Sequence, residues 1–433
     1  MDQIVRKIAL LGMGTVGGGV YTILERRKEE MPFQIGASLE VAKVLVRNKA
    51  KYEKTVPVEK LTDRFADIIE DDSIDIVVEV MGGIEPARTY IAEALQKGKH
   101  VVTANKDLMA THGHELLEIA AANHCDLLFE ASVAGGIPII RPLKQCLAGN
   151  QVTEIMGIIN GTTNFIMTKM KEDGMDFKEA LQLATDLGYA EADPTADVEG
   201  YDAGRKLAIM ASIAFHTPVT FGDVFTEGIT KITAKDMRYA RELGCTIKLL
   251  GIAKLAEGGI EVKVHPTLIP ETHPLASVND SFNAVFVHGD AVDDAMFYGR
   301  GAGALPTGSA VVGDIMDVAR NMLFGCNGRI GCSCYKSYPI KQVGETRSSF
   351  YVRMMLEDRA GTLASMASVF ASNGVSISIL LQKAKIGDTA EIVVVTHEVA
   401  EKGFQDAMTV LSSLSMVKEI NSIIRVYQLG NEA

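Results

Sequence analysis

Residues 5–17, VRKIALLGMGTVG, decide the fold of the N-terminal part of the chain. The run is continuously apolar from Ile8 and stops at Gly12, which is typical of a buried parallel strand. The glycines that follow have the spacing G-x-G-x-x-G, which allows a tight turn and close approach of a pyrophosphate to the next helix. The residues predicted to contact a dinucleotide are Gly12, Met13, Gly14, Thr15, Val16 and Gly17.

The segments after this motif alternate between strand and helix patterns, which makes cofactor binding a better interpretation than a simple glycine turn. We expect strands at 5–11, 39–46, 75–80, 100–103 and 126–130, and helices at 15–28, 85–97 and 112–123. Such alternation predicts an α/β fold with a Rossmann-type, doubly wound parallel sheet over residues 1–140. A helix expected at 310–323 would return to this domain and complete it with residues 300–325.

Two further domains are expected. Residues 141–320 carry helix patterns at 177–187, 201–214 and 234–244 and strand patterns at 152–159, 261–268 and 284–288, which indicate a second α/β domain. Residues 345–433 carry the order βαββαβ, with strands at 349–356, 375–381, 391–396 and 416–427 and helices at 362–372 and 403–414. That order predicts a ferredoxin-like unit.

The composition excludes several classes of protein. The 433 residues include 43 Lys and Arg and 55 Asp and Glu, so the net charge of −12 argues against nucleic-acid binding. Six cysteines over this length form no disulfide framework and fit a reduced compartment. No apolar run reaches the roughly 18 residues of a membrane span, and no signal peptide is recognisable. We therefore expect a cytoplasmic protein.

Residues 187–206, LGYAEADPTADVEGYDAGRK, concentrate acidic side chains around a single lysine. Asp202 and Lys206 lie four apart, where a helix places them on one face. The cluster of carboxylates is suited to hold a substrate ammonium group and to place one lysine for proton transfer; its members are Glu191, Asp193, Asp197, Glu199 and Asp202. The alternative is a solvated acidic loop followed by a helix that begins at Asp202.

Polar residues at the ends of the predicted strands are further candidates, because ligands bind at the carboxyl ends of parallel strands. Arg47 stands where an acidic residue normally accepts the ribose hydroxyls, which favours NADP over NAD; the alternative is a solvated surface arginine. Lys106 follows the strand at 100–103 and is placed to approach the nicotinamide, or is an ordinary exposed loop lysine. Additional cofactor contacts are expected at Gly82, Thr103 and Ala104.

Two segments of small residues each allow a functional and a purely structural interpretation. EASVAGGIP at 130–138 allows close backbone approach, either to a ligand or at a domain junction. NGTTN at 160–164 offers Gly161 and Thr162 to a polar substrate, or only forms turns and caps a helix. Cys332 and Cys334 form C-x-C without a second pair at metal spacing, so a zinc site is not expected.

Six ordered motifs together resemble the homoserine dehydrogenase family and cover nearly the whole chain. These are GMGTVG, TANK at 103–106, EASVAGGIP, INGTTNF at 159–165, the segment 184–206, and YGRGAGALPTGSAV at 298–311. The C-terminal βαββαβ unit resembles an ACT domain, a small-molecule sensor. The resemblance implies that residues 141–320 form the substrate and dimerisation domain.

The resemblance implies interconversion of L-homoserine and L-aspartate 4-semialdehyde with NAD or NADP, in threonine, methionine and isoleucine biosynthesis. By position, Lys206 would donate the proton and Lys106 would assist beside the cofactor. Glu191 and Asp202, with Asp197 close by, would hold the amino end of the substrate, and Gly303 would close on the cofactor. A sodium or other monovalent cation would bind mostly to backbone oxygens of Glu130, Val133, Gly135 and Ile137.

The ACT resemblance implies feedback inhibition by an amino acid, with threonine favoured, and a homodimer or homotetramer. We expect the C-terminal unit to be separable near residue 345 without loss of activity. The expected effector contacts are Asp358, Ala360, Gly361, Asn373, Gly374, Val375 and Ile377.

Two rival interpretations remain. An aspartate-semialdehyde dehydrogenase would need a nucleophilic cysteine, and none of the six cysteines stands in an obvious nucleophile setting. A non-catalytic sensor would not need both lysines and the acidic residues of the segment 187–206.

Overall fold

The computed structural model describes residues 4–427, without the side chains of residues 383–386. The chain divides into two compact units. The first contains Met1–Ile155, Arg205–Asp223 and Phe282–Tyr338, and the second contains Met156–Gly204, Val224–Ser281 and Pro339–Ala433. In the part of the chain described, no helix is both long and apolar enough to cross a membrane.

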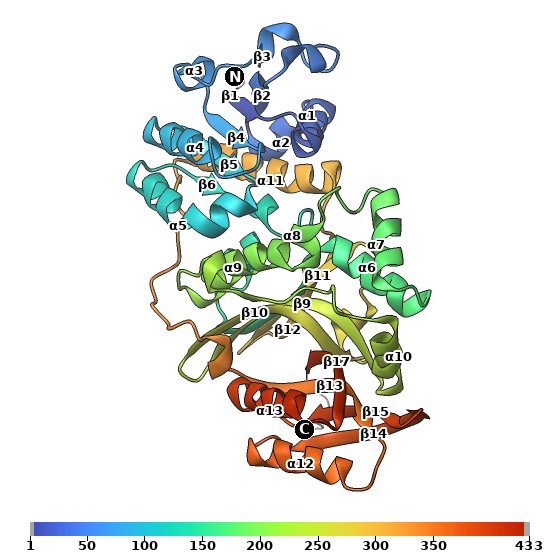
Figure 1. Cartoon of the computed structure of the whole chain (residues 1–433). Coiled ribbons are helices and arrows are strands. Elements are labelled where there is room, and N and C mark those ends of the chain that lie inside the picture. The colour runs from blue at the N-terminus through green and yellow to red at the C-terminus, as the bar shows by residue number, and fades with distance from the viewer. Residues whose placement is uncertain (1–3, 428–433) are drawn as a thin grey trace. The chain divides into compact units, whose positions relative to one another are not determined.

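The first unit is built on a six-stranded sheet in the order β3-β2-β1-β4-β5-β6 (Figure 1). All its neighbouring strands are parallel, which confirms the doubly wound sheet. The predicted strand at 126–130 is too long, because the chain turns into a 3₁₀ helix at Glu130–Ser132. The strands are β1 (Val5–Leu11), β2 (Ser38–Leu45), β3 (Leu61–Thr62), β4 (Ile76–Glu79), β5 (His100–Thr103) and β6 (Leu127–Leu128).

Helix α11 (Ala304–Phe324) returns to this sheet from far along the chain, as predicted (Figure 1). It lies against α1 (Thr15–Arg27) so closely that a Cβ on Gly19 would be 2.0 Å from the carbonyl oxygen of Ala304. Its buried side chains share one hydrophobic core with β1 and β4. The other helices of the sheet are α2 (Met31–Ile35), α3 (Ala66–Ile69), α4 (Ala87–Gln96) and α5 (Lys106–Ala122).

The first unit also contains the antiparallel hairpin of β11 (Phe282–Gly289) and β12 (Asp293–Arg300). Strand β12 was missed in the sequence because its outward positions are exposed and its first two residues are aspartates. Strand β7 (Val152–Ile158) and helix α9 (Tyr201–Phe215) each span a boundary between the two units.

The second unit contains a long antiparallel hairpin, β9 (Cys245–Ala256) and β10 (Gly259–Pro270). The sequence did not predict β9, because Lys248 interrupts its apolar run. That lysine is 2% exposed, and its ammonium group donates to the side-chain oxygen of Asn164 and to the carbonyl oxygen of Val278. The helices of this part are α6 (Gly161–Glu172), α7 (Phe177–Asp186), α8 (Thr195–Val198) and α10 (Ala234–Glu242).

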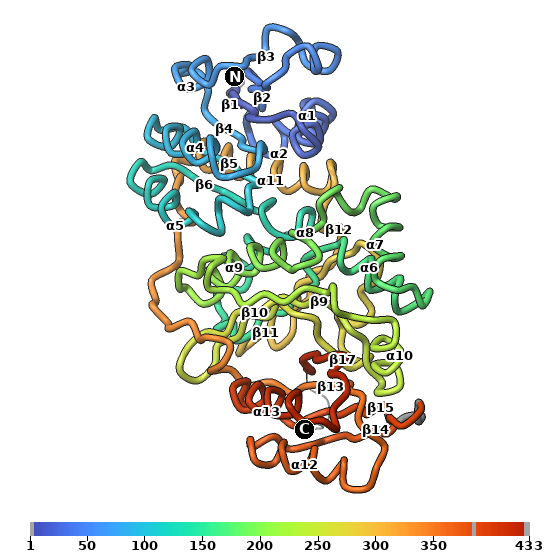
Figure 2. The backbone as a smooth tube through the Cα atoms, viewed as in Figure 1, coloured from blue at the N-terminus to red at the C-terminus, as the bar shows by residue number. Residues whose placement is uncertain are grey.

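The C-terminal part of this unit has the predicted order βαββαβ, which confirms the ferredoxin-like pattern. Its strands pair antiparallel in the order β17-β13-β15-β14, and the last strand returns beside the first (Figure 2). A short strand, β16 (Val399–Ala400), pairs with β13. The main elements are β13 (Arg347–Glu357), α12 (Thr362–Ser372), β14 (Ile377–Ile386), β15 (Thr389–Thr396), α13 (Glu401–Ser413) and β17 (Val417–Val426).

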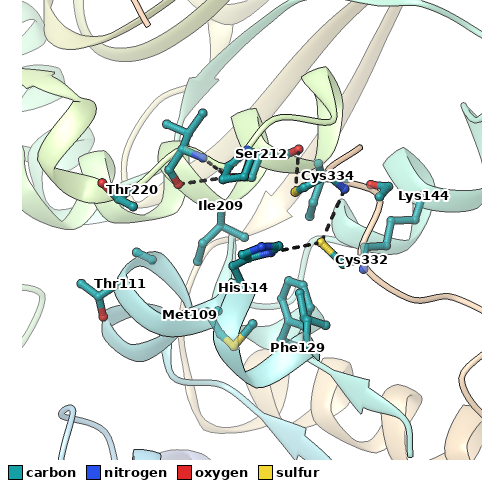
Figure 3. A pocket seen from close by; sticks show the side chains of 17 residues that line it. Met109, Thr111, His114, Phe129, Lys144, Ile209, Ser212, Thr220, Cys332 and Cys334 are labelled. Carbon is teal, nitrogen blue, oxygen red and sulfur yellow. Dashed lines mark hydrogen bonds between the residues drawn. The ribbon is translucent and has the colours of Figure 1, made fainter. Parts of the chain in front are cut away.

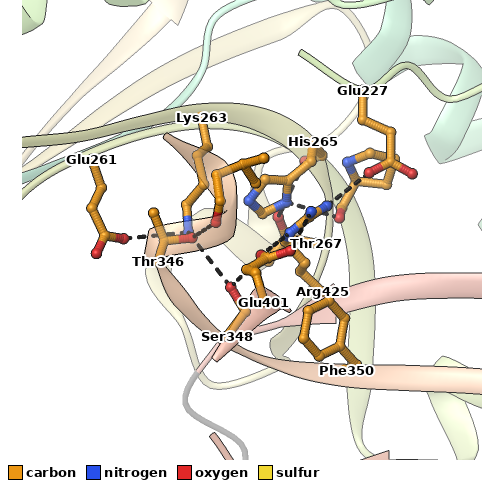
Figure 4. A network of polar contacts seen from close by, with 12 residues as sticks. Glu227, Glu261, Lys263, His265, Thr267, Thr346, Ser348, Phe350, Glu401 and Arg425 are labelled. Atoms are coloured by element: carbon orange, nitrogen blue, oxygen red, sulfur yellow. Dashed lines mark hydrogen bonds and ion pairs between the residues drawn. The ribbon is translucent and has the colours of Figure 1, made fainter. Parts of the chain in front are cut away.

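This sheet continues into the β9–β10 hairpin, because β17 pairs parallel with β10. A buried charged cluster lies at the pairing of β17 with β10 (Figure 4). Arg425 is bonded to Glu401 through two nitrogens, at 2.6 and 2.9 Å, and to Glu227 at 2.7 Å. Lys263 donates to the hydroxyl of Thr346 at 3.2 Å. The predicted boundary near residue 345 is therefore not a boundary between compact units.

Candidate active site

The glycine turn has the shape that a dinucleotide phosphate requires. Gly12 has φ +101°, a left-handed conformation that favours glycine. A Cβ on Gly17 would lie 2.2 Å from the carbonyl oxygen of Gly12, so the third glycine lets α1 start against the turn. Gly14 is exposed, and no atom lies within 4 Å of a Cβ built on it. No side chain caps the N-terminus of α1, so the first backbone N–H groups of this helix are left for a ligand. Such a helix N-terminus stabilises an anion.

A buried hydrogen-bond network shapes the carboxyl ends of β4 and β5. Glu79 is fully buried, and its carboxylate accepts the N–H of Met81 and of Gly82 at 2.8 and 3.1 Å. The hydroxyl of Thr103 donates to the same carboxylate at 2.6 Å. Asn105 donates to the carbonyl oxygen of Gly83 at 2.6 Å. Thr103 therefore has its hydroxyl engaged within the protein, while Gly82 stays exposed beside it.

Glu79 and Asn105 were missed in the sequence analysis. Glu79 is a carboxylate at the end of an apolar strand, and such a residue needs a buried partner. Asn105 stands in the motif TANK, where its side chain accepts the N–H of Leu108 at 3.1 Å and caps α5. The cap explains why this helix begins at residue 106 rather than at 112 as predicted.

Lys106 is consequently the first residue of α5 and half-buried, so the alternative of an exposed loop lysine is wrong. Lys206 is also half-buried and lies on α9, four residues after Asp202, as the spacing predicted. An ion pair joins the immediate neighbours of the two lysines: Arg205 Nε lies 2.9 Å from Asp107 Oδ1. It holds the start of α5 against α9 within the first unit, which also contains the glycine turn.

In the second unit, Asn160 joins two of the predicted substrate carboxylates. Its amide nitrogen donates to Asp197 at 2.6 Å and to Asp202 at 2.8 Å. Its amide oxygen accepts the N–H of Thr163 at 2.9 Å and caps α6, so the asparagine is held in place. Asp202 is 5% exposed. Asn160 was not singled out in the sequence, although it precedes both Gly161 and Thr162.

The other members of the acidic segment take separate roles. Asp193 accepts the N–H of Thr195 at 3.1 Å in the turn before α8. Glu191 is exposed. Gly161 and Thr162 are half-buried at the start of α6, and the hydroxyl of Thr162 donates to the carbonyl oxygen of Tyr189 at 2.7 Å. The segment is thus a carboxylate pair around Asn160 rather than one cluster.

The segment EASVAGGIP is held mainly by its own carboxylate. Glu130 is buried and accepts three backbone N–H groups, from Ile139, Ile140 and Arg141, within 2.8 Å. Gly135 has φ +55°, and a Cβ there would lie 2.3 Å from the carbonyl oxygen of Gly301. Val133 and Ile137 are buried on either side. Among residues 4–427 no group of three His, Cys, Asp or Glu side chains is arranged for a metal ion.

Comparison with known proteins decides the family. The model of the homoserine dehydrogenase family matches residues 138–316, and that of its NAD binding domain matches residues 12–130. An ACT domain matches residues 350–415. A homoserine dehydrogenase from Bacillus subtilis is 45% identical over 97% of this chain and 98% of its own. The chain belongs to the homoserine dehydrogenase family.

Other homoserine dehydrogenases agree with this assignment. The enzyme of Corynebacterium glutamicum is 48% identical over 97% of this chain and 95% of its own length. A crystal structure of the Thiobacillus denitrificans enzyme superposes with a TM-score of 0.94 at 43% identity, over 99% of this chain and 100% of that one. A hyperthermophilic archaeal homoserine dehydrogenase, solved in complex with NADPH, has a TM-score of 0.63 at 26% identity, over 73% and 98%.

The resemblance found in the sequence is therefore confirmed. The chain is a homoserine dehydrogenase, an NAD(P)-dependent oxidoreductase of amino-acid biosynthesis that carries an ACT domain. The rival aspartate-semialdehyde dehydrogenase has no support from the relatives. Burial raises the pKa of both the Cys125 and the Cys245 thiol to about 11, which makes these two poor nucleophiles.

Residues predicted to contact an effector in this homoserine dehydrogenase flank α12. Asp358 and Ala360 are exposed before the helix, and Gly361 opens it with φ +90°. Asn373 ends the helix, and Gly374 follows with φ +71°. The side chains of Val375 and Ile377 pack in the ACT core, so only their backbone groups are placed to meet a ligand.

Two predicted cofactor residues are exposed. Arg47 lies in the loop after β2, which ends at Leu45, and Gly303 precedes α11 with φ +126°. Ala104 is half-buried after β5.

Proposed function

We propose that this homoserine dehydrogenase prefers NADP and uses Lys206 as the proton donor when L-aspartate 4-semialdehyde is reduced. The ion pair between Arg205 and Asp107 carries the proposal, because it fixes the two lysine-bearing helices to each other in the unit that contains the glycine turn. A spectrophotometric assay that follows NADPH with aspartate semialdehyde tests the activity. The absence of turnover with either dinucleotide would contradict it.

Bound cofactor supplies the hydride, and the protein side chains orient the substrate and move the proton. As charge builds on the carbonyl oxygen, the ammonium group of Lys206 donates a proton to it. Asp197 and Asp202 hold the substrate ammonium group. The amide nitrogen of Asn160 donates to both carboxylates and so keeps them close together. We assign Lys106 to assisting catalysis beside the cofactor. We assign Glu191 to binding the amino end of the substrate from the outer part of the site.

Arg47 is proposed to pair with the 2′-phosphate of NADP. The Arg47→Ala variant is expected to raise the KM for NADPH about tenfold, since a hydrogen bond to a charged group contributes about 1.5–3 kcal/mol. The KM for NADH should stay within about twofold, because NADH lacks that phosphate. Initial rates with both cofactors measure the effect.

The matched control for this experiment is Lys49→Ala. Lys49 lies two residues further along the same exposed loop and pairs with Asp63 at 3.2 Å. Its removal should leave the ratio of the two KM values unchanged. An equal loss for NADPH and NADH in the Arg47 variant would show that the arginine does not contact the 2′-phosphate.

We further propose that threonine inhibits the enzyme through the ACT domain, at the turns that flank α12. An amino-acid ligand needs donors for its carboxylate and an acceptor for its ammonium group. The backbone at Gly361, where α12 begins without a side-chain cap, offers the donors, and Asp358 offers the acceptor. The buried cluster around Arg425 then connects the ACT domain to β10 within the same unit.

The Asp358→Ala variant is expected to raise the threonine concentration for half-inhibition at least about tenfold, because it removes the only charged acceptor of the proposed site. Uninhibited turnover should not change. Dose–response curves with threonine measure the effect, and Asp406→Ala, an exposed aspartate on α13, is the control. If the full-length enzyme ignores threonine, methionine and isoleucine alike, the effector proposal fails.

Two further features complete the proposal. The backbone oxygens of Glu130, Val133, Gly135 and Ile137 are candidates for a monovalent cation such as sodium. Strand β14 is the last strand of its sheet, so its outer edge can pair with a second copy of the chain and give a homodimer or homotetramer.

A further inference from the structure

Outside the residues proposed for catalysis, two cysteines line a pocket in the first unit (Figure 3). The pocket lies between α5, which contributes His114, and α9, which contributes Ser212. The segment that carries Cys332 and Cys334 closes one side of it. Cys332 is exposed and Cys334 is half-buried, so a small reagent can reach the pair.

The two thiols are held in different states by their contacts. The backbone N–H of Cys334 donates to Cys332 Sγ at 3.5 Å. His114 Nδ1 lies 3.8 Å from the same sulfur. These contacts lower the pKa of Cys332 well below that of a free thiol, first through Cys334 and then through His114. The pKa of Cys334 is raised by the neighbouring Cys332 sulfur and by burial.

A positive charge and a helix backbone complete the setting. Lys144 lines the same pocket; burial lowers its pKa, and the sulfurs of Cys332 and Cys334 oppose this by favouring its charged form. The thiol of Cys334 also contacts the carbonyl oxygen of Ser212 on α9, at 3.7 Å. The lowered pKa of Cys332 favours its nucleophilic thiolate form, and the raised pKa of Cys334 favours a protonated thiol two residues away.

We propose that Cys332 and Cys334 are a redox-active dithiol, which peroxides oxidise to a disulfide within the chain. The Cys332 thiolate attacks one peroxide oxygen, the O–O bond breaks, and a sulfenic acid and hydroxide form. The Cys334 sulfur then attacks the sulfenic sulfur, forms the S–S bond and releases water. Hydroxide takes one proton from solvent, so two sulfurs lose two electrons in all and hydrogen peroxide leaves as two waters. A dithiol reductant reverses the change.

A metal site is the competing explanation for two cysteines beside a histidine. The described residues contain no group of three His, Cys, Asp or Glu side chains placed to hold an ion. The contact of the Cys334 N–H with the Cys332 sulfur favours oxidation instead, because it holds the two residues close enough for a bond of about 2.05 Å to form between their sulfurs.

Oxidation removes contacts as well as adding a bond. A disulfide has no S–H, so the carbonyl oxygen of Ser212 loses its donor, and His114 loses its thiolate partner. The segment around residues 332–334 then holds less firmly to α5 and α9. The redox chemistry of Cys332 and Cys334 does not depend on which lysine donates the catalytic proton.

The test uses the full-length protein and hydrogen peroxide. We expect its intact mass to fall by about 2 Da, a dithiol having become a disulfide, and to be restored by dithiothreitol. Peptide mapping should find the bond between Cys332 and Cys334. Alkylation by iodoacetamide at pH 6 should be about tenfold faster at Cys332 than at the exposed Cys146, with an apparent pKa below about 7.5.

Two variants sharpen the result. The Cys334→Ser variant should form no disulfide and should keep a sulfenic or sulfinic acid at Cys332, whereas Cys146→Ser should behave like the wild type. Zinc that binds stoichiometrically and blocks alkylation, a disulfide between two chains, or equal alkylation rates at Cys332 and Cys146 would each overturn the proposal.

Discussion

Replacing Lys206 by alanine is expected to lower kcat by more than about 100-fold, while the Kd for NADPH changes less than about twofold. A positioned acid contributes about 100- to 10,000-fold, and a 100-fold loss corresponds to about 2.7 kcal/mol of transition-state stabilisation. The cofactor site should survive, because backbone contacts shape the glycine turn and Met81 and Thr103 hold the Glu79 carboxylate. Steady-state rates and NADPH fluorescence titration measure the two quantities.

The control is Lys178→Ala, which removes an exposed lysine on α7. Both variants should unfold at the temperature of the wild type within a few degrees. A folded Lys206→Ala enzyme with near-normal turnover would exclude this residue as the proton donor. In that case Lys106, whose neighbour Asp107 pairs with Arg205, would be the next candidate.

The elements that could be predicted from the sequence are those with a local signature. The apolar run and glycine spacing of residues 5–17 predicted β1 and the start of α1 at their observed residues. Helix α12 was likewise predicted at its observed bounds. Such patterns depend on the backbone and on the burial of neighbouring residues, so a single chain segment contains the information.

The residues that could not be predicted depend on partners that are distant in sequence. Asn160 lies 37 and 42 positions from the two carboxylates that it joins. Glu79 meets Thr103 across two strands, and Lys248 is buried because Asn164 and Val278 satisfy its ammonium group. No spacing rule connects such positions, and only the folded chain shows that their polar groups are paired.

The contacts around residue 345 could not be predicted for the same reason. The motif order identified the ACT domain correctly but could not show that β17 pairs with β10 or that Arg425 is bonded to Glu227. A chain cut at 345 would leave Lys263 without Thr346 and would expose the edge of β10. That the truncated enzyme keeps its activity stays a prediction, and we expect it to be less stable than the full-length chain.

A second buried pair gives the largest expected effect on stability. Arg353 on β13 is 4% exposed, and Asp236 on α10 is fully buried. Arg353 Nε lies 2.8 Å from Asp236 Oδ1, and Nη1 lies 3.2 Å from Glu391 Oε1. The Arg353→Ala variant should lower the free energy of unfolding by about 3–5 kcal/mol, because it leaves the buried Asp236 carboxylate without its cation, while Glu391 keeps Lys235. Urea denaturation monitored by circular dichroism measures the change.

Arg347→Ala is the matched control, since it removes an arginine from the same strand. Arg347 pairs with Glu398 at 3.6 Å, and the two side chains are 58% and 65% exposed. Water already solvates both charges, so that loss should stay within about 1 kcal/mol. An Arg353 variant no less stable than the Arg347 variant would contradict the burial argument. A large difference would show that the contact between the ACT domain and α10 stabilises the whole second unit. A sensor needs such a rigid connection if effector binding at α12 is to change the position of the substrate carboxylates.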